Sequence, residues 1–302
     1  MVLLSAYSFH GESALSEAIP VLLSLVLLIP IYIWLGNYTR EERLHKEIKG
    51  RAKSSVVFWI LILFILVLAV RLLSVLSLGM PYEKTPLIYL VILTIVVIER
   101  TDVSVFGFES EKIGRSLVKG AIFYLVLGGS ILSIEYLLIF AFTGQAMVVA
   151  FDILSFLLAM PFQTLCVGIS EEGFFRGYIQ THLEKLFTFR KAILAQALLF
   201  GLWHFVWNLS PFNPLNMAIY VAASCFWGLL VGYFYGKSRS LVPVVLTHGL
   251  WNSVIHGMST NEAALSALER MPLLSQLAVE FLPYIIGGTC TFVFIKCLPA
   301  RR

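Results

Sequence analysis

Charged residues are scarce in this sequence. Asp, Glu, Lys and Arg make up 13% of its 302 residues, whereas Ala, Val, Ile, Leu, Met, Phe, Trp, Tyr and Cys make up 59%. Ordinary soluble domains contain roughly 25% charged and roughly 45–50% apolar residues. With a mean hydropathy of +0.87, the apolar side chains exceed what one core with a water-exposed surface can bury. This composition excludes a soluble globular protein and predicts an integral membrane protein.

Two further features are missing, a basic patch and a disulfide framework. The formal net charge is only +4, and Lys and Arg occur in short groups between apolar runs, so the sequence predicts no nucleic-acid partner. The four cysteines are Cys166, Cys225, Cys290 and Cys297, and all lie within or at the edge of apolar runs. We expect them to be buried as small hydrophobic residues rather than paired in disulfides.

Apolar runs of about 20 residues, the length that crosses a bilayer, dominate the rest. Nine candidate spans lie near residues 17–36, 55–80, 86–99, 117–142, 147–169, 191–209, 216–236, 240–257 and 273–297. The third is shorter than the hydrocarbon core requires, and a re-entrant or interfacial segment is its alternative. The pattern therefore predicts an all-α, polytopic transmembrane helical bundle of eight or nine spans.

Lys and Arg residues favour alternate loops. With nine spans, 19 of the 22 basic residues fall in Arg40–Lys53, Arg100–Lys119, Arg176–Lys191, Lys237–Arg239 and the tail from Lys296. The opposite loops hold Lys84 and Arg270, and Arg71 lies inside the second span. By the positive-inside rule we expect the N-terminus outside and the C-terminus in the cytosol of a plasma-membrane protein.

Ionisable side chains within spans gather between residues 163 and 256, and because they are costly in hydrocarbon they mark functional candidates. The first motif is SEEGFFRGY, from Ser170. On a continuing helix Glu172 and Arg176 would pair at i and i+4, and Glu171 would point about 100° away. The pattern predicts that Glu171 lacks a partner, which suits a carboxylate that takes a proton from water.

Two later motifs add polar side chains to neighbouring spans. FGLWH sets Phe200 and His204 on one helix face, and THGLWN does the same for His248 and Asn252. Any one of these motifs alone is typical of helix packing. Three in adjacent spans favour a single water-containing cavity that serves them all.

Two chemistries suit such a cavity. In one, Glu171 and His204 activate a water molecule while His248 and Asn252 donate hydrogen bonds to the oxyanion of a peptide carbonyl. In the other, Glu171, His204 and His248 hold Zn²⁺ with a water as fourth ligand. No H-E-x-x-H motif occurs. We favour the metal-free arrangement, with no cofactor, and keep Zn²⁺ as the alternative.

In this order the motifs EEGFFR, FGLWH and HGLWN resemble the CPBP family of CAAX-processing and bacteriocin-processing intramembrane proteases, over about residues 165–256. The resemblance implies a helical bundle around a cavity open to the cytosol and the membrane, where a peptide bond is hydrolysed with or without a metal. It assigns catalytic roles to Glu171, His204, His248 and Asn252, and supporting roles to Glu172, Arg176 and Phe200.

The resemblance leaves much of the chain unassigned. We expect an N-terminal transmembrane region of unassigned role (1–146), catalytic spans (147–257), and a C-terminal span with a cytosolic tail (258–302), all integrated in one membrane domain.

The predicted function is an intramembrane endopeptidase that cleaves a membrane-anchored protein or peptide near its C-terminus, with prenylated CAAX proteins and sorting tails as substrate classes. The alternative is a non-catalytic immunity or scaffold protein of the same fold. A transporter that uses Glu135, Asp152 and Glu280 ranks last, because no inverted repeat is evident.

Overall fold

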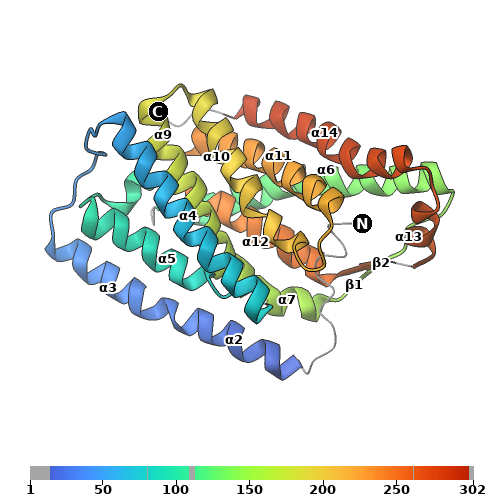
Figure 1. The fold of residues 1–302 in the computed structure, drawn as a ribbon, viewed down its shortest axis with the longest axis horizontal. Coiled ribbons are helices and arrows are strands. Elements are labelled where there is room, and N and C mark those ends of the chain that lie inside the picture. Colours follow the sequence, from blue (N-terminus) through green and yellow to red (C-terminus); the bar gives the residue numbers. More distant parts are fainter. Residues whose placement is uncertain (1–13, 80, 109–112, 261, 299–302) are drawn as a thin grey trace.

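The computed structural model describes residues 14–79, 81–108, 113–260 and 262–298, and helices dominate it (Figure 1). Six helical segments are long and apolar enough to cross a membrane. They are Val21–Arg40, Lys53–Leu78, Ile113–Thr143, Ile153–Leu186, Pro214–Ser238 and Leu273–Cys297. The predicted all-α polytopic membrane protein is thereby confirmed. Both chain ends, including the predicted exterior N-terminus, lie outside the described residues.

The N-terminal half contains one apolar helical segment that is shorter than the six long ones. The helices of this half are α2 (Ala14–Val26), α3 (Leu28–Glu41), α4 (Lys53–Leu78), α5 (Lys84–Leu93) and α6 (Ile113–Thr143). A π-helical turn, Thr94–Ile98, extends α5, and a 3-10 turn, Val103–Phe106, follows. The weakest predicted span, 86–99, thus corresponds to Lys84–Ile98, a short apolar helix outside the six long ones.

The C-terminal half carries all three motifs. Its helices are α7 (Ile153–Phe162), α8 (Ile169–Glu172), α9 (Thr181–Leu186), α10 (Phe189–Trp203), α11 (Pro214–Ser238), α12 (Leu241–Gly257), α13 (Glu262–Glu269) and α14 (Leu273–Cys297). The first three join through π-helical segments Gln163–Gly168 and Gly173–Gln180 into one long helix. The helix thus continues beyond residue 169, where the predicted apolar span ends, through polar residues that are buried against other helices.

Two short strands, absent from the sequence prediction, join distant segments. β1 (Val149–Phe151) pairs antiparallel with β2 (Met258–Thr260), with Val149 opposite Thr260. β1 precedes α7 and β2 follows α12. The start of α7 and the end of α12 therefore lie at the same end of the bundle, as Figure 1 shows.

Loops that carry basic residues contact one another. The backbone N–H of His45 donates to the carbonyl of Arg100 at 2.8 Å, which joins the loop after α3 to the loop after α5. Arg239, after α11, forms an ion pair with Glu184 near the end of α9. Loops that the nine-span pattern assigns to one side thus contact each other in two separate places.

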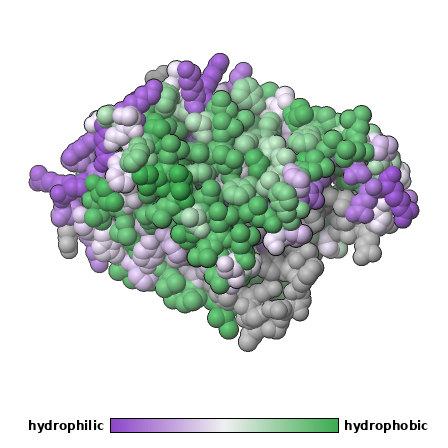
Figure 2. Space-filling view, in the orientation of Figure 1, coloured by the Kyte–Doolittle hydropathy of each residue, from purple (hydrophilic) through white to green (hydrophobic). Residues whose placement is uncertain are grey.

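The bundle surface is largely apolar. Figure 2 shows hydrophobic residues across the middle of the visible face and hydrophilic residues towards its ends. On α4, Phe58, Ile65 and Leu73 are exposed, whereas Ile60 and Phe64 are buried. An apolar residue on either face of such a helix avoids water, since the outer face meets lipid.

Lipid exposure also explains one wrong prediction. All four cysteines are free, as expected, and Cys166 is buried, but Cys290 and Cys297 on α14 are exposed. An apolar run in a membrane protein includes lipid-facing positions, so it does not by itself predict burial.

Close helix contacts hold the motif-bearing helices together. A Cβ atom at Gly228 of α11 would lie 3.0 Å from the Cα of Ala197 on α10, tighter than an ordinary van der Waals contact, so glycine favours this close approach. The Thr247 hydroxyl of α12 donates to the carbonyl of Gly120 on α6 at 3.0 Å. These contacts fix α10, α11 and α12 around the region where the motifs meet.

Candidate active site

The two adjacent carboxylates of the first motif lie inside the long helix. Glu171 and Glu172 belong to α8, between two π-helical segments, and are 2% and 0% exposed. Successive side chains on a helix diverge by about 100°, so each carboxylate has its own partners. π-Helical turns are frequent at functional sites.

Glu172 forms the predicted pair with Arg176. Its Oε1 lies 3.1 Å from Arg176 Nη1 and 2.7 Å from His248 Nδ1. The guanidinium of Arg176 lies over the Phe200 ring, 4.1 Å from the ring centroid. This carboxylate therefore links the first motif to both of the others.

Glu171 also has a cationic partner, contrary to the sequence prediction. Lys84 Nζ lies 2.5 Å from Glu171 Oε1, and the Trp203 indole N–H donates to the same oxygen at 2.9 Å. Lys84, predicted in an external loop, is 2% exposed. Lys84 was counted among the loop charges, but the chain after α4 turns inward, and Lys84 begins α5 within the protein.

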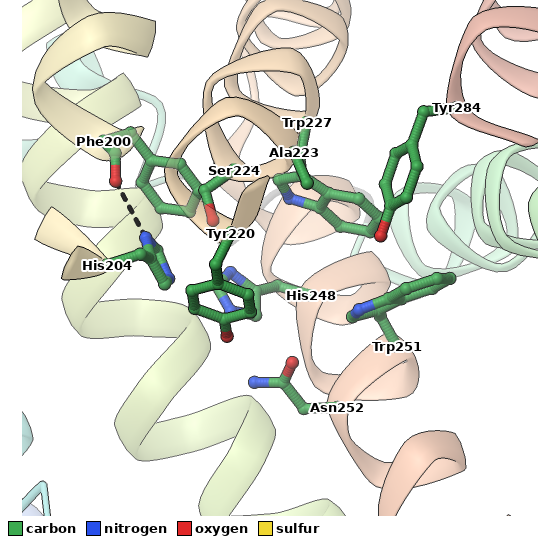
Figure 3. Close-up of a pocket in the computed structure, with 10 residues that line it drawn as sticks. All are labelled: Phe200, His204, Tyr220, Ala223, Ser224, Trp227, His248, Trp251, Asn252 and Tyr284. Carbon is green, nitrogen blue, oxygen red and sulfur yellow. Dashed lines mark hydrogen bonds between the residues drawn. The ribbon is translucent and has the colours of Figure 1, made fainter. Parts of the chain in front are cut away.

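Two imidazoles face the other oxygen of Glu171. His204 Nε2 and His248 Nε2 each lie 3.8 Å from Glu171 Oε2. His204 follows the last residue of α10, and its Nδ1 donates to the Phe200 carbonyl at 2.8 Å (Figure 3). Since Glu172 holds Nδ1 of His248, both imidazoles direct Nε2 towards one point. Among the described residues, Glu171 Oε2 accepts no hydrogen bond.

A small cavity, open on one side, adjoins the imidazoles. Its lining residues are Phe200, His204, Tyr220, Ala223, Ser224, Trp227, His248, Trp251, Asn252 and Tyr284 (Figure 3). Glu171 is not among the lining residues, but its Oε2 lies 3.8 Å from Nε2 of the two lining histidines, His204 and His248. Half of the lining residues are Phe, Trp or Tyr, and His204, Ser224, His248 and Asn252 add polar groups (Figure 3).

Asn252 lies on the cavity wall one helical turn after His248 and is anchored by a residue that the motifs do not include. Its Nδ2 donates to Gln163 Oε1 at 2.9 Å, and Gln163 Nε2 lies 3.2 Å from His256 Nε2. One N–H of the Asn252 amide remains for another acceptor.

Four residues of the site escaped the sequence analysis: Arg71, Lys84, Gln163 and Trp203. Arg71 is buried in α4 and lies 2.5 Å from Glu83 Oε1 and 3.8 Å from Glu171 Oε1. The sequence did contain a signal for Arg71, because an arginine within an apolar run is itself a functional candidate. Trp203 lies inside the second motif, but nothing in the sequence marks its indole as a donor to Glu171.

One of the carboxylates proposed for a transport path has a simpler structural role. Asp152 accepts the backbone N–H of Leu154 at 2.9 Å and caps the exposed start of α7. It therefore needs no transport role to explain its position.

The predicted metal ligands Glu171, His204 and His248 do converge, but their surroundings do not fit a divalent cation. Lys84 lies 2.5 Å and Arg71 3.8 Å from the Glu171 carboxylate, so two positive charges already compensate it. Within the described part of the chain, no group of three or more His, Cys, Asp or Glu side chains has an arrangement that could hold a metal.

Comparison with known families concerns the same region. Residues 153–254 match the family model described as type II CAAX prenyl endopeptidase Rce1-like. The matched range contains Glu171, His204, His248 and Asn252, and it excludes Lys84. Comparisons with curated proteins and with solved structures give no match. The resemblance predicted from the three motifs is confirmed: over residues 153–254 the chain is similar to the Rce1-like type II CAAX prenyl endopeptidases.

Proposed function

We propose that this integral membrane protein is an intramembrane endopeptidase in which Glu171 activates a water molecule. One observation carries the proposal: Glu171 Oε2 lies 3.8 Å from the Nε2 atoms of both His204 and His248. A water molecule about 2.8 Å from each of these atoms bridges such a separation. A carboxylate and an imidazole on one water form a general-base arrangement.

The reaction begins when Glu171 Oε2 removes a proton from this water, assisted by His204. The oxygen attacks the carbonyl carbon of the substrate peptide bond. The oxyanion accepts hydrogen bonds from the second amide N–H of Asn252 and from Nε2 of His248 when that atom carries a proton. The proton held by Glu171 then passes to the leaving amine as the C–N bond breaks.

The substrate is a membrane-anchored protein or peptide that is cleaved near its C-terminus. The Rce1-like match supports a prenylated CAAX substrate class. The aromatic side chains of Tyr220, Trp227, Trp251 and Tyr284 along the cavity suit an apolar chain next to the scissile bond. Sorting-tail proteins form a second substrate class.

The proposed topology keeps nine helical segments, or eight if Lys84–Ile98 is re-entrant. Contacts among the basic loops support a common side for them, and the positive-inside rule makes that side the cytosol of a plasma-membrane protein. The N-terminus is then outside and the C-terminus cytosolic. Within this arrangement residues 147–257 form the catalytic core, between regions 1–146 and 258–302 of one domain.

The test is cleavage in proteoliposomes. Purified protein is incubated with a synthetic membrane-anchored peptide that ends in a prenylated CAAX sequence, and with the same peptide anchored by an acyl chain. Mass spectrometry should detect release of the C-terminal tripeptide from the prenylated substrate. A parallel preparation of Glu171→Gln controls for contaminating proteases and should release the tripeptide at least about 100-fold more slowly.

The non-catalytic alternative makes the opposite prediction. A scaffold or immunity protein tolerates substitution of Glu171, His204 and His248 without loss of its cellular phenotype. Persistence of a phenotype in all three folded variants, with no cleavage by the wild-type protein, would replace the peptidase proposal.

A further inference from the structure

A buried chain of charges reaches Glu171 from the N-terminal half of the protein. Arg71 on α4 contacts Glu83 at 2.5 Å, Glu83 contacts Lys84 at 3.0 Å, and Lys84 contacts Glu171 at 2.5 Å. All four side chains are at most 3% exposed. Arg71, Glu83 and Lys84 lie outside the range 153–254 that matches the family model.

The two carboxylate oxygens of Glu171 have different partners. Oε1 accepts hydrogen bonds from Lys84 and Trp203. Oε2 faces His204 and His248. Two donors on one oxygen restrict rotation of the carboxylate, which keeps the other oxygen directed at the imidazoles.

Neighbouring groups in turn fix Lys84. Its ammonium group has three N–H donors, and Glu83 Oε1 and Glu171 Oε1 are acceptors within 3.0 Å. The ammonium group also lies 5.1 Å from the Trp203 ring centroid. Because a buried lysine with two carboxylate partners has little freedom, it can hold Glu171 in one orientation.

We propose that Lys84 is a positioning residue for the general base: it holds Glu171 Oε1 so that Oε2 faces the reacting water. This inference rests on the proposed peptidase function. It gives the N-terminal region a direct part in the site, since α4 and the start of α5 supply the cation and its supporting charges.

The kinetic test compares Lys84→Met, Lys84→Arg and the wild type in proteoliposomes. Methionine keeps the apolar stem and removes the donor and the charge, so kcat should fall on the order of 100-fold, the loss typical of a misplaced catalytic group. KM should stay unchanged, because Lys84 does not line the cavity. Arginine restores a cationic donor, so Lys84→Arg should recover part of kcat.

Controls separate positioning from folding. Lys119→Met removes an exposed lysine of α6 and should leave kcat and melting temperature unchanged. If Lys84→Met does not fold, Lys84→Leu replaces it, because leucine also lacks both the donor and the charge. Wild-type kcat in a folded Lys84→Met or Lys84→Leu variant would overturn the inference, as would a rise in KM with kcat unchanged.

A second readout does not depend on proteolysis. The infrared band of the Glu171 carboxylate is assigned by comparison of the wild type with Glu171→Gln, in which this band is absent. Its frequency reports the hydrogen bonds to the carboxylate, so Lys84→Met should shift it and Lys119→Met should not. If the wild-type protein cleaves no substrate, the peptidase proposal fails, and this band still decides whether Lys84 holds Glu171. An unshifted band would contradict the inference.

Discussion

The ion pair between Glu172 and Arg176 allows a quantitative test that needs no substrate. Both side chains are 0% exposed, and Arg176 Nη1 lies 3.1 Å from Glu172 Oε1. Coulomb's law with an effective dielectric constant of about 20 gives an attraction of about 5 kcal/mol at this separation. Desolvation offsets much of it, but removal of Glu172 leaves the buried Arg176 guanidinium without its carboxylate partner, and removal of Arg176 leaves Glu172 only the hydrogen bond from His248 Nδ1.

We therefore expect Glu172→Gln and Arg176→Met each to lower the free energy of unfolding by about 3–5 kcal/mol. The double variant has no buried charge to compensate, so its loss should be well below the sum of the single losses. The coupling energy should be at least about 2 kcal/mol. The double variant should not cleave at the wild-type rate, because His248 Nδ1 loses its carboxylate partner.

The assay is reversible unfolding in mixed micelles, followed by tryptophan fluorescence. The matched control is the more exposed pair Arg239–Glu184, whose side chains are 45% and 11% exposed. Exposed pairs contribute about 0–1 kcal/mol, so the coupling energy there should be small. A coupling energy at Glu172–Arg176 no larger than that of the control would refute the assigned role of this buried pair.

Further predictions concern the oxyanion site, metal dependence and lipid exposure. Asn252→Ala should lower kcat by about 10²–10³-fold through loss of an oxyanion donor. Gln163→Leu should lower kcat less, because the Asn252 amide then loses only its hydrogen bond to Gln163. Equal kcat values in both variants and the wild type would contradict this prediction. Prolonged dialysis against a chelator should leave the rate of cleavage unchanged, and a loss that Zn²⁺ restores would reverse the metal-free assignment. A membrane-soluble maleimide should modify Cys290 and leave Cys166 unmodified in the folded protein; the opposite pattern would show that α14 faces the protein interior.

The sequence predicted the helical class and the meeting of the three motifs because both follow from local rules. Hydropathy identifies apolar helices, and the i and i+4 spacing identifies the contact between Glu172 and Arg176. The convergence of His204 and His248 on Glu171 was inferred from the high cost of separate polar groups in a membrane. These arguments need no knowledge of how distant helices pack.

The parts that depend on packing between distant segments were not predictable. Nothing near Lys84 indicates that it pairs with a carboxylate 87 residues later. Likewise, the strand pairing of Val149 with Thr260 depends on where α6 and α12 end in space. The full length of this helix was also not predicted. The sequence pattern allowed a helix that continues to Arg176 but did not indicate that the helix runs to Leu186, because polar residues buried between helices resemble those at a membrane surface.

The most direct test of the central claim, that Glu171 activates the water that hydrolyses the peptide bond, is the single-turnover cleavage rate of Glu171→Gln. The variant and the wild type are compared in the same proteoliposomes, with the same substrate and with melting temperatures measured in parallel. General-base catalysis contributes about 10²–10⁴-fold, so the rate in the folded variant should fall at least about 100-fold. A folded Glu171→Gln protein that cleaves at the wild-type rate would contradict the account.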